Sequence, residues 1–285
     1  MSATCARTST TRSTVMSDLP TETISTLYGT FHCWPGDFIN RQLIEFGAHT
    51  RNELSMLREF IAPGDNILDV GAHIGSFAVP FARFNQGVGS IFAFEAHPGN
   101  FRLLRMNIAE NGLDSSISPV NAIVFDRDAT FKVLQPDAAN TGTFTFLPDS
   151  ASNHLVPVLG LDAWHQASAA DLTVHLLKID VEGAELSVLN SARKLIVSSR
   201  PMLYIEIHQA GLARFNAMIG QVEEFLRTSG YELFRNCGER NSANDAFRMK
   251  RIDTLESEGA FFDVLAIHRE CPRLAKTLAL ITGEA

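Results

Sequence analysis

Cysteine, clustered basic residues and long apolar segments are all scarce in this sequence. Its four cysteines are scattered and form no Cys-x-x-Cys pair, which argues against a zinc ribbon or a disulfide framework and fits a reducing cytosol. No apolar run approaches the roughly 20 residues that span a bilayer. We therefore expect a cytoplasmic protein that does not enter membranes.

A surplus of positive charge is missing as well. Acidic residues outnumber Lys and Arg by 32 to 24, giving a net charge of −8, and the basic residues form no run. Nucleic-acid binding depends on clustered cations that neutralise phosphates, so we expect a small molecule as partner and no nucleic acid. The first 20 residues are rich in Ser and Thr and are expected to be a disordered tail, with a targeting peptide as the alternative.

Short apolar segments alternate with segments of helical periodicity. This alternation predicts an α/β fold with a mostly parallel sheet covered by helices on both faces. We expect one domain over 21–285, with an N-terminal extension at 21–62, a cofactor-binding core at 63–210 and a hairpin insert at 125–160; strands at 231–234 and 261–268 form a closing antiparallel pair. The predicted parallel strands are 66–70, 90–94, 117–124, 174–179 and 202–207, and the predicted helices are 51–61, 75–84, 98–111, 183–191 and 222–228.

Acidic residues gather where these parallel strands end. In an open parallel sheet, ligands bind beyond the carboxyl ends of the strands. Four of the five strand ends carry a carboxylate, which favours a binding site over a purely structural edge. The strand ends are Asp69-Val70-Gly71, Glu95-Ala96, Asn121-Ala122, Asp180-Val181-Glu182 and Glu206-Ile207-His208.

The loop after the first predicted strand indicates the type of cofactor. A dinucleotide site needs Gly-x-Gly-x-x-Gly, but counting from Gly71 the third residue is His73 and the sixth is Ser76. A turn from Gly71 to Gly75 can instead bring backbone close to an amino acid's carboxylate, with Asp69 or a neighbour near its ammonium. Methionine carries both groups, and a strand-end glutamate suits a ribose diol. An NAD-type oxidoreductase and a non-catalytic binding module remain the alternatives.

Three segments together resemble one known family. Asp69–Gly75, Phe92–Pro98 and Leu177–Glu185 are similar to three blocks of the FkbM-type methyltransferases, and Pro201–His208 matches the family's Pro-led strand ending in Glu-x-His. The resemblance covers roughly residues 50–210. It implies a class I, Rossmann-like methyltransferase fold, S-adenosylmethionine as donor, and O-methylation of a hydroxyl on a sugar or a small secondary metabolite.

The resemblance also implies roles for individual residues. Gly71, Ala72 and Gly75 would approach the methionine moiety, Glu95 would hold the ribose, and Asn121 with Ala122 would flank the adenine. The expected cofactor-binding set is Glu53, Asp69, Gly71, Ala72, His73, Gly75, Glu95, Ala96, Asn121, Ala122 and Asp180. Two positions depart from the family: His73 stands where Asn is frequent, which changes how the methionine end is held, and Ala96 stands where Pro is frequent. For Glu53, a solvated helix face is the alternative.

Three residues at the ends of two central strands are candidates for activating the acceptor. Asp180 would face the transferring methyl group, and Glu206 and His208 share one face of their strand because side chains alternate. If the two strands are neighbours, all three converge. Either they hold a hard divalent metal such as Mg²⁺, or His208 acts as general base, or the cluster is inert. His154, in the insert, is a second candidate for the base.

Overall fold

The computed structural model describes residues 21–134, 145–149, 156–240 and 242–282. The expected tail over residues 1–20 and the candidate His154 lie outside these residues. Within the described part of the chain, no helix is both long enough and apolar enough to cross a membrane.

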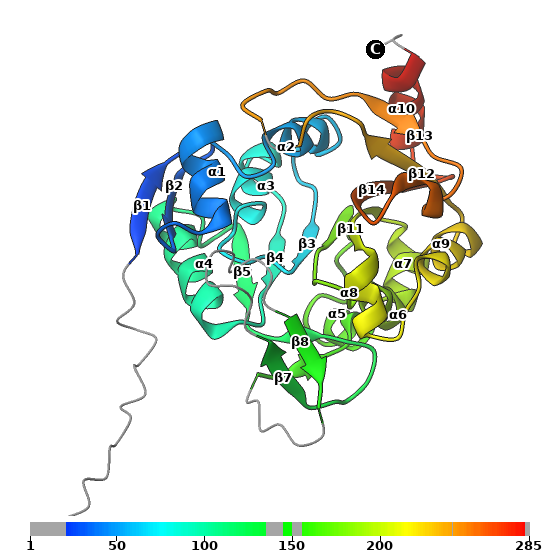
Figure 1. Ribbon diagram of the computed structural model, residues 1–285, viewed down its shortest axis with the longest axis horizontal. Helices are drawn as coiled ribbons and strands as arrows, with labels where there is room; N and C mark the ends of the chain where they lie inside the picture. Colours follow the sequence, from blue (N-terminus) through cyan, green and yellow to red (C-terminus); the bar gives the residue numbers. More distant parts are fainter. Residues whose placement is uncertain (1–20, 135–144, 150–155, 241, 283–285) are drawn as a thin grey trace, which may run out of the picture.

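An eight-stranded sheet forms the centre of the molecule (Figure 1). Its order is β13-β12-β14-β11-β10-β3-β4-β5. The strands from β11 to β5 are parallel to one another, whereas β14, β12 and β13 pair antiparallel. The strands are β3 (Ile67–Val70), β4 (Ile91–Phe94), β5 (Ile117–Val120), β10 (Leu176–Ile179), β11 (Met202–His208), β12 (Tyr231–Asn236), β13 (Met249–Arg251) and β14 (Phe261–His268).

Helices cover both faces of this sheet. One apolar cluster joins the sheet to α1–α4, and a second joins the opposite face to α5–α9. The helices are α1 (Phe38–Phe46), α2 (Arg51–Arg58), α3 (Ala78–Phe84), α4 (Pro98–Glu110), α5 (Leu161–Ser168), α6 (Glu185–Ser191), α7 (Arg193–Ser199), α8 (Gln209–Arg214), α9 (Ile219–Thr228) and α10 (Arg273–Thr282). The predicted α/β architecture with a mostly parallel sheet is therefore confirmed.

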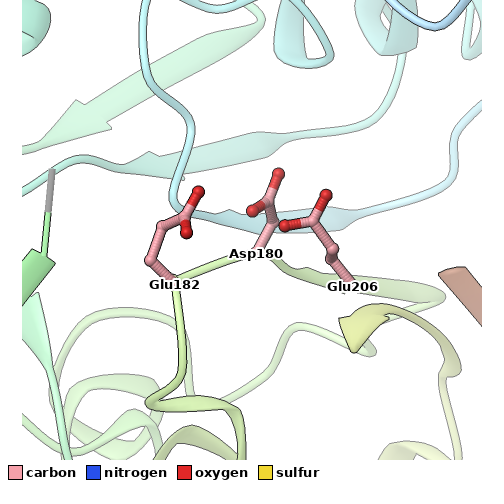
Figure 2. Close-up of side chains that lie close together, drawn as sticks. All are labelled: Asp180, Glu182 and Glu206. Carbon is pink, nitrogen blue, oxygen red and sulfur yellow. The ribbon is translucent and has the colours of Figure 1, made fainter. Parts of the chain in front are cut away.

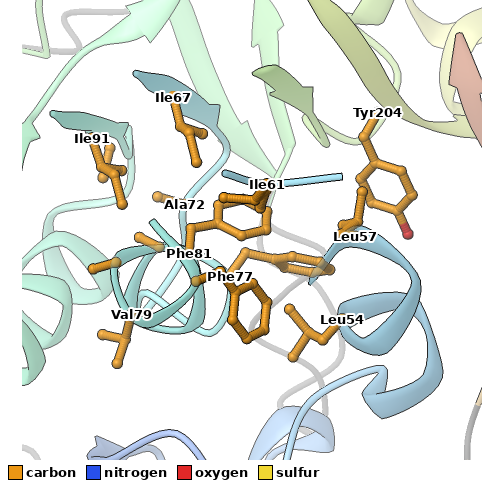
Figure 3. Close-up of a cluster of buried hydrophobic side chains, with 14 of the residues drawn as sticks. Leu54, Leu57, Ile61, Ile67, Ala72, Phe77, Val79, Phe81, Ile91 and Tyr204 are labelled. Atoms are coloured by element: carbon orange, nitrogen blue, oxygen red, sulfur yellow. The ribbon is translucent and has the colours of Figure 1, made fainter. Parts of the chain in front are cut away.

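Alternation along the central strands divides the core in two. On β3, Ile67 belongs to the cluster under α1–α4, and Leu68 belongs to the cluster under α5–α9. Figure 3 shows the first of these clusters, where Phe77 and Phe81 pack between the sheet and α2. Both faces of a sheet buried in this way must be apolar, so the buried Asp69 on β3 is an exception that needs a partner.

Several predicted boundaries differ from the structure. The strand expected over 117–124 is divided, because β6 (Ile123–Val124) leaves the sheet and pairs with β9 (Val158–Leu159). The helix expected from 75 begins only at Ala78, since the preceding residues form a turn, and Pro80 is then tolerated in its first turn. The insert contains the predicted hairpin, β7 (Phe131–Leu134) and β8 (Thr145–Pro148).

An N-terminal hairpin packs beside α4 (Figure 1). It consists of β1 (Glu22–Ser25) and β2 (Thr30–Cys33). Asn107 accepts a hydrogen bond from the His32 N–H at 2.7 Å, and it donates to the carbonyls of His32 at 3.1 Å and Ile74 at 2.8 Å. One helical side chain therefore replaces a missing strand neighbour for β2 and also ties it to the loop after β3.

We expect Asn107→Ala to lower the free energy of unfolding by about 2–3 kcal/mol, because it leaves buried backbone groups without partners. Urea denaturation followed by circular dichroism measures this change. Asn190→Ala is the control, since Asn190 makes one exposed bond to Arg193 and should cost less than about 0.5 kcal/mol. Equal effects of the two substitutions would contradict the interpretation.

Candidate active site

A cavity of about 330 Å³ lies at the carboxyl ends of β3, β4, β10 and β11. Its wall is completed by residues from outside the parallel strands, including α1, the β7–β8 hairpin and the segment before β13. The residues that line the cavity include Phe38, His49, Gly71, His73, Glu95, Ala96, Ala122, Phe131, Phe146, Asp180, Glu182, Glu206, His208, Arg240 and Phe261.

Glu95 follows β4 and is fixed by the backbone. Its carboxylate accepts hydrogen bonds from the N–H groups of His73 at 2.8 Å and His97 at 2.7 Å. Burial raises the pKa of Glu95 to about 7, although these two bonds favour the ionised form. Asn121 does not line the cavity; its side chain donates to the Glu95 carbonyl at 2.7 Å and so holds this strand end in place.

The glycine turn after β3 is dictated by the neighbouring strand. Gly71 has a φ of +80°, and a Cβ there would lie 1.7 Å from the carbonyl oxygen of Asp180. Glycine is therefore required for β3 and β10 to end side by side, whatever ligand binds beyond them. His73 also has a positive φ of 52°. Gly71 and His73 line the cavity, whereas Ala72 and Gly75 do not.

Lys178 lines the cavity and links Asp69, Asp180 and the Gly71 carbonyl. Its side chain is only 2% exposed, and Nζ lies 3.0 Å from Asp69 Oδ1 and 3.5 Å from Asp180 Oδ2. Nζ also donates to the Gly71 carbonyl at 3.2 Å. Burial alone would lower the pKa of Lys178, but the two carboxylates raise it above its ordinary value. Lys178 therefore stays charged, and Asp69 serves the site as its partner without lining the cavity.

Three carboxylates converge at the cavity wall. Figure 2 shows the side chains of Asp180, Glu182 and Glu206 pointing toward one another, and one oxygen from each lies within 4.8 Å of the others. Burial together with Asp180 raises the pKa of Glu206 well above its ordinary value, and burial raises that of Glu182 to about 8. Burial opposes ionisation of Asp180 too, but Lys178 lowers its pKa overall.

Arg240 is the second cation of the site. Its Nη2 donates to Glu206 Oε1 at 2.6 Å, its Nε lies 3.3 Å from Asp263 Oδ2, and its guanidinium lies over the Phe261 ring. It belongs to the segment between β12 and β13. That segment is anchored to α2 by a bidentate contact, in which Arg51 Nε and Nη2 donate to Asp245 Oδ1 and Oδ2, each at 2.6 Å.

His208 lies at the end of β11, which is a direct neighbour of β10. The predicted convergence of Asp180, Glu206 and His208 on one cavity is thus present. The candidate metal ligands differ from the expected set, however, because Glu182 takes the third place. His208 Nδ1 lies 3.7 Å from Glu182 Oε2 instead.

Glu53 does not reach the cavity. It is 3% exposed, and its Oε1 accepts a hydrogen bond from Asn236 Nδ2 at 3.0 Å. The alternative of a solvated helix face is wrong for this residue, and a contact with cofactor gains no support. Its neighbour in sequence, Asn52, is also fully buried, so this turn of α2 faces the protein interior.

Among the residues of the cavity wall that sequence reasoning missed, His49, Glu182 and Arg240 carry titratable or charged groups. Glu182 lies two residues after Asp180 and was within reach of the strand-end argument. The other two carry no local signal, because tertiary folding brings them from the N-terminal extension and the β12–β13 segment. Burial lowers the pKa of His49 to about 3, so its ring is neutral.

Residues 69–233, more than half of the chain, match the family model of the methyltransferase FkbM domain. The 31-O-demethyl-FK506 methyltransferase FkbM of Streptomyces tacrolimicus is 26% identical over 201 residues, which are 60% of this chain and 74% of that protein.

Two solved structures resemble the chain weakly. Methyltransferase FkbM from Methylobacillus flagellatus KT is 16% identical with a TM-score of 0.43, covering 73% of this chain but only 44% of that one. A SAM-dependent O-methyltransferase from Thermotoga maritima is 13% identical with a TM-score of 0.42, covering 87% of this chain and 77% of that one.

We expect Lys178→Met to lower the free energy of unfolding by about 3–5 kcal/mol, because Asp69 is left as an uncompensated buried charge. Urea denaturation measures the loss, and Lys194→Met, at an exposed position of α7, is the control. Adding Asp69→Asn should recover part of the stability. If the double variant were as unstable as the sum of the single ones, the pair would not be the cause.

Proposed function

The chain belongs to the FkbM family of methyltransferases, and from that premise we propose that it transfers a methyl group from S-adenosylmethionine to a hydroxyl of a small-molecule acceptor. The observation that carries the proposal is the Glu95 carboxylate, which two backbone N–H groups hold at the cavity wall. A carboxylate at the end of the second parallel strand suits a ribose diol.

The residues around Glu95 fit the rest of this donor. Gly71 and His73 line the cavity and suit the methionine end, while Ala96 and Ala122 offer small apolar surfaces for the adenine. When bound, S-adenosylmethionine supplies a methyl group on a positively charged sulfur. Asp180 remains ionised beside Lys178, and its negative charge favours a cation at this end of the cavity.

The remaining wall suits an acceptor with an apolar body. Phe131 and Phe146 of the hairpin and Phe261 of β14 line the cavity. In the reaction, the acceptor oxygen attacks the methyl carbon, the carbon–sulfur bond breaks with its electron pair on sulfur, and the hydroxyl proton passes to His208. Holding oxygen and methyl in line can contribute roughly 7–11 kcal/mol. A sugar or secondary-metabolite hydroxyl fits this description.

A divalent metal is the second candidate for activating the hydroxyl. Asp180, Glu182 and Glu206 form an all-carboxylate group, and hard cations such as Mg²⁺ prefer oxygen ligands. Two of the three carboxylates already lie beside cations, Asp180 near Lys178 and Glu206 near Arg240. This arrangement weakens the attraction for a metal, and we favour His208 as general base.

We expect the affinity for S-adenosylhomocysteine, measured by calorimetry, to fall as the pH falls through 7. The ionised form of Glu95 accepts the ribose hydroxyls, and its pKa is about 7, so binding should be about tenfold weaker at pH 6 than at pH 8.

Glu95→Gln should weaken binding and flatten this dependence, while Glu110→Gln, at an exposed position of α4, should leave it unchanged. Tight binding of a nicotinamide dinucleotide with none of S-adenosylhomocysteine would overturn the donor assignment.

We expect methyl transfer from labelled donor to a panel of hydroxylated acceptors to survive exhaustive chelation with EDTA. His208→Gln should reduce kcat by about 10²–10⁴, the usual contribution of a general base, whereas His32→Gln on β2 should not. Activity that disappears with EDTA and returns with Mg²⁺ would assign the carboxylates to a metal. Absence of transfer to every acceptor would favour a non-catalytic binding module.

A further inference from the structure

The turn after β10 holds Glu182 in an uncommon backbone conformation. Glu182 has a φ of +58°, in the left-handed region that disfavours non-glycine residues, and Gly183 follows with a φ of +119°. Such strain persists only where the surrounding structure enforces it. It occurs two residues after Asp180, at the edge of the cavity, which indicates that the placement of the Glu182 side chain matters.

A close contact between two glycines enforces this turn. A Cβ on Gly183 would lie 2.3 Å from the carbonyl carbon and oxygen of Gly211, and a Cβ on Gly211 would lie 3.0 Å from the Gly183 Cα and 3.1 Å from the Glu182 carbonyl oxygen. Gly211 is in α8, whose N-cap residue is His208. The contact therefore locks the turn that carries Glu182 against the helix that starts at His208.

The two side chains face each other across this contact. His208 Nδ1 lies 3.7 Å from Glu182 Oε2. Nδ1 is itself buried and has no hydrogen-bond partner among the described residues, although the side chain as a whole is 28% exposed. Phe261 packs edge-on against the ring, with 5.6 Å between ring centroids. The exposed part of the imidazole is thus not the nitrogen that faces Glu182.

We propose that Glu182 is a positioning residue that accepts the Nδ1–H of His208 and so leaves Nε2 to receive the proton of the acceptor hydroxyl. At 3.7 Å the carboxylate already faces Nδ1 without substrate, and the contact shortens in the catalytic complex, as catalytic hydrogen bonds commonly do. As the acceptor oxygen takes the methyl group, its proton moves to Nε2, Nδ1 keeps its own proton, and the Glu182 carboxylate stabilises the imidazolium. This proposal rests on the proposed function, since it assigns a role within the same reaction.

Other charges near the pair are compatible with this role. Asp180 and Glu185 lie on the side of Glu182, and Arg214 and Arg240 face the pair from α8 and the β12–β13 segment. Arg214 Nη1 lies within hydrogen-bond distance of Thr145 on β8, at 3.4 Å, so α8 also connects the pair to the hairpin that lines the cavity.

The first test is spectroscopic and needs no substrate. In protein labelled with ¹⁵N-histidine, the ring nitrogen shifts of His208, assigned by their loss in His208→Gln, report which nitrogen carries the proton. At pH 9, above the pKa of about 8 of Glu182, we expect the Nδ1–H form in the wild type, a shift toward the Nε2–H form in Glu182→Ala, and retention of Nδ1–H in Glu182→Gln, whose amide oxygen still accepts. The same form in the wild type and in Glu182→Ala would overturn the proposal.

Kinetics supply the second test. Glu182→Ala should lower kcat at least tenfold while the acceptor KM and the Kd for S-adenosylhomocysteine stay within about twofold, and Glu182→Gln should recover part of kcat. A loss confined to KM or Kd would show that Glu182 binds ligand and does not position His208. If the wild type methylates no acceptor, the proposed function fails, whereas the spectroscopic test still decides the contact between Glu182 and His208.

Substitutions at two helical glycines, Gly211 and Gly220, test the role of the contact between Gly183 and Gly211. Gly211→Ala should lower kcat and disturb the His208 shifts, because the added methyl group pushes α8 away from the turn. Gly220→Ala on α9 is the matched control, since its Cβ would meet only Glu256 Oε1 at an ordinary 3.5 Å. Thermal unfolding checks that both variants fold. A Gly211→Ala protein with unchanged kcat and shifts would overturn the role of the glycine contact.

Discussion

The buried contact between Lys178 and Asp69 is the interaction on which the rest of the site depends. It joins the adjacent strands β10 and β3 at a side-chain exposure of 2% or less, and the same ammonium reaches the Gly71 carbonyl. Removing either partner would leave a charge in an otherwise apolar layer, where isolated charges are very costly. The pair therefore fixes how the two strand ends meet, and with them the glycine turn and Asp180.

The features of the fold and of the site that depend on local sequence pattern could be predicted from the sequence. Strand ends follow from apolar runs closed by glycine or an acid, and the carboxyl ends of parallel strands share one edge. That reasoning predicted that Glu95, Asp180, Glu206 and His208 lie at one site, and all four line the cavity. It assigned the glycine at position 71 to the cofactor, whereas the structure shows a more immediate reason in the Asp180 carbonyl.

What the sequence could not predict depends on contacts between distant segments. Arg240 reaches Glu206 because Asp245 anchors its segment to Arg51, nearly 200 positions earlier in the chain. The hydrophobic periodicity of the sequence carries no information about a contact between such distant residues. The environment of Glu53 could not be predicted for the same reason. Its position on the helix allowed a contact with solvent or with cofactor, but its hydrogen-bond partner, Asn236, comes from the distant strand β12.

The balance of charge at the cavity explains why these distant contacts matter. Asp180, Glu182 and Glu206 crowd within 4.8 Å, and like charges at that distance cannot all stay ionised without cations nearby. Lys178 and Arg240 supply two positive charges beside Asp180 and Glu206, and burial keeps Glu182 mostly protonated near neutral pH, its pKa being about 8. A positively charged sulfur entering the cavity would favour ionisation of Glu182. The ionised carboxylate is the form that can accept a hydrogen bond from the imidazole N–H. Donor binding and alignment of the base would then be coupled through one carboxylate.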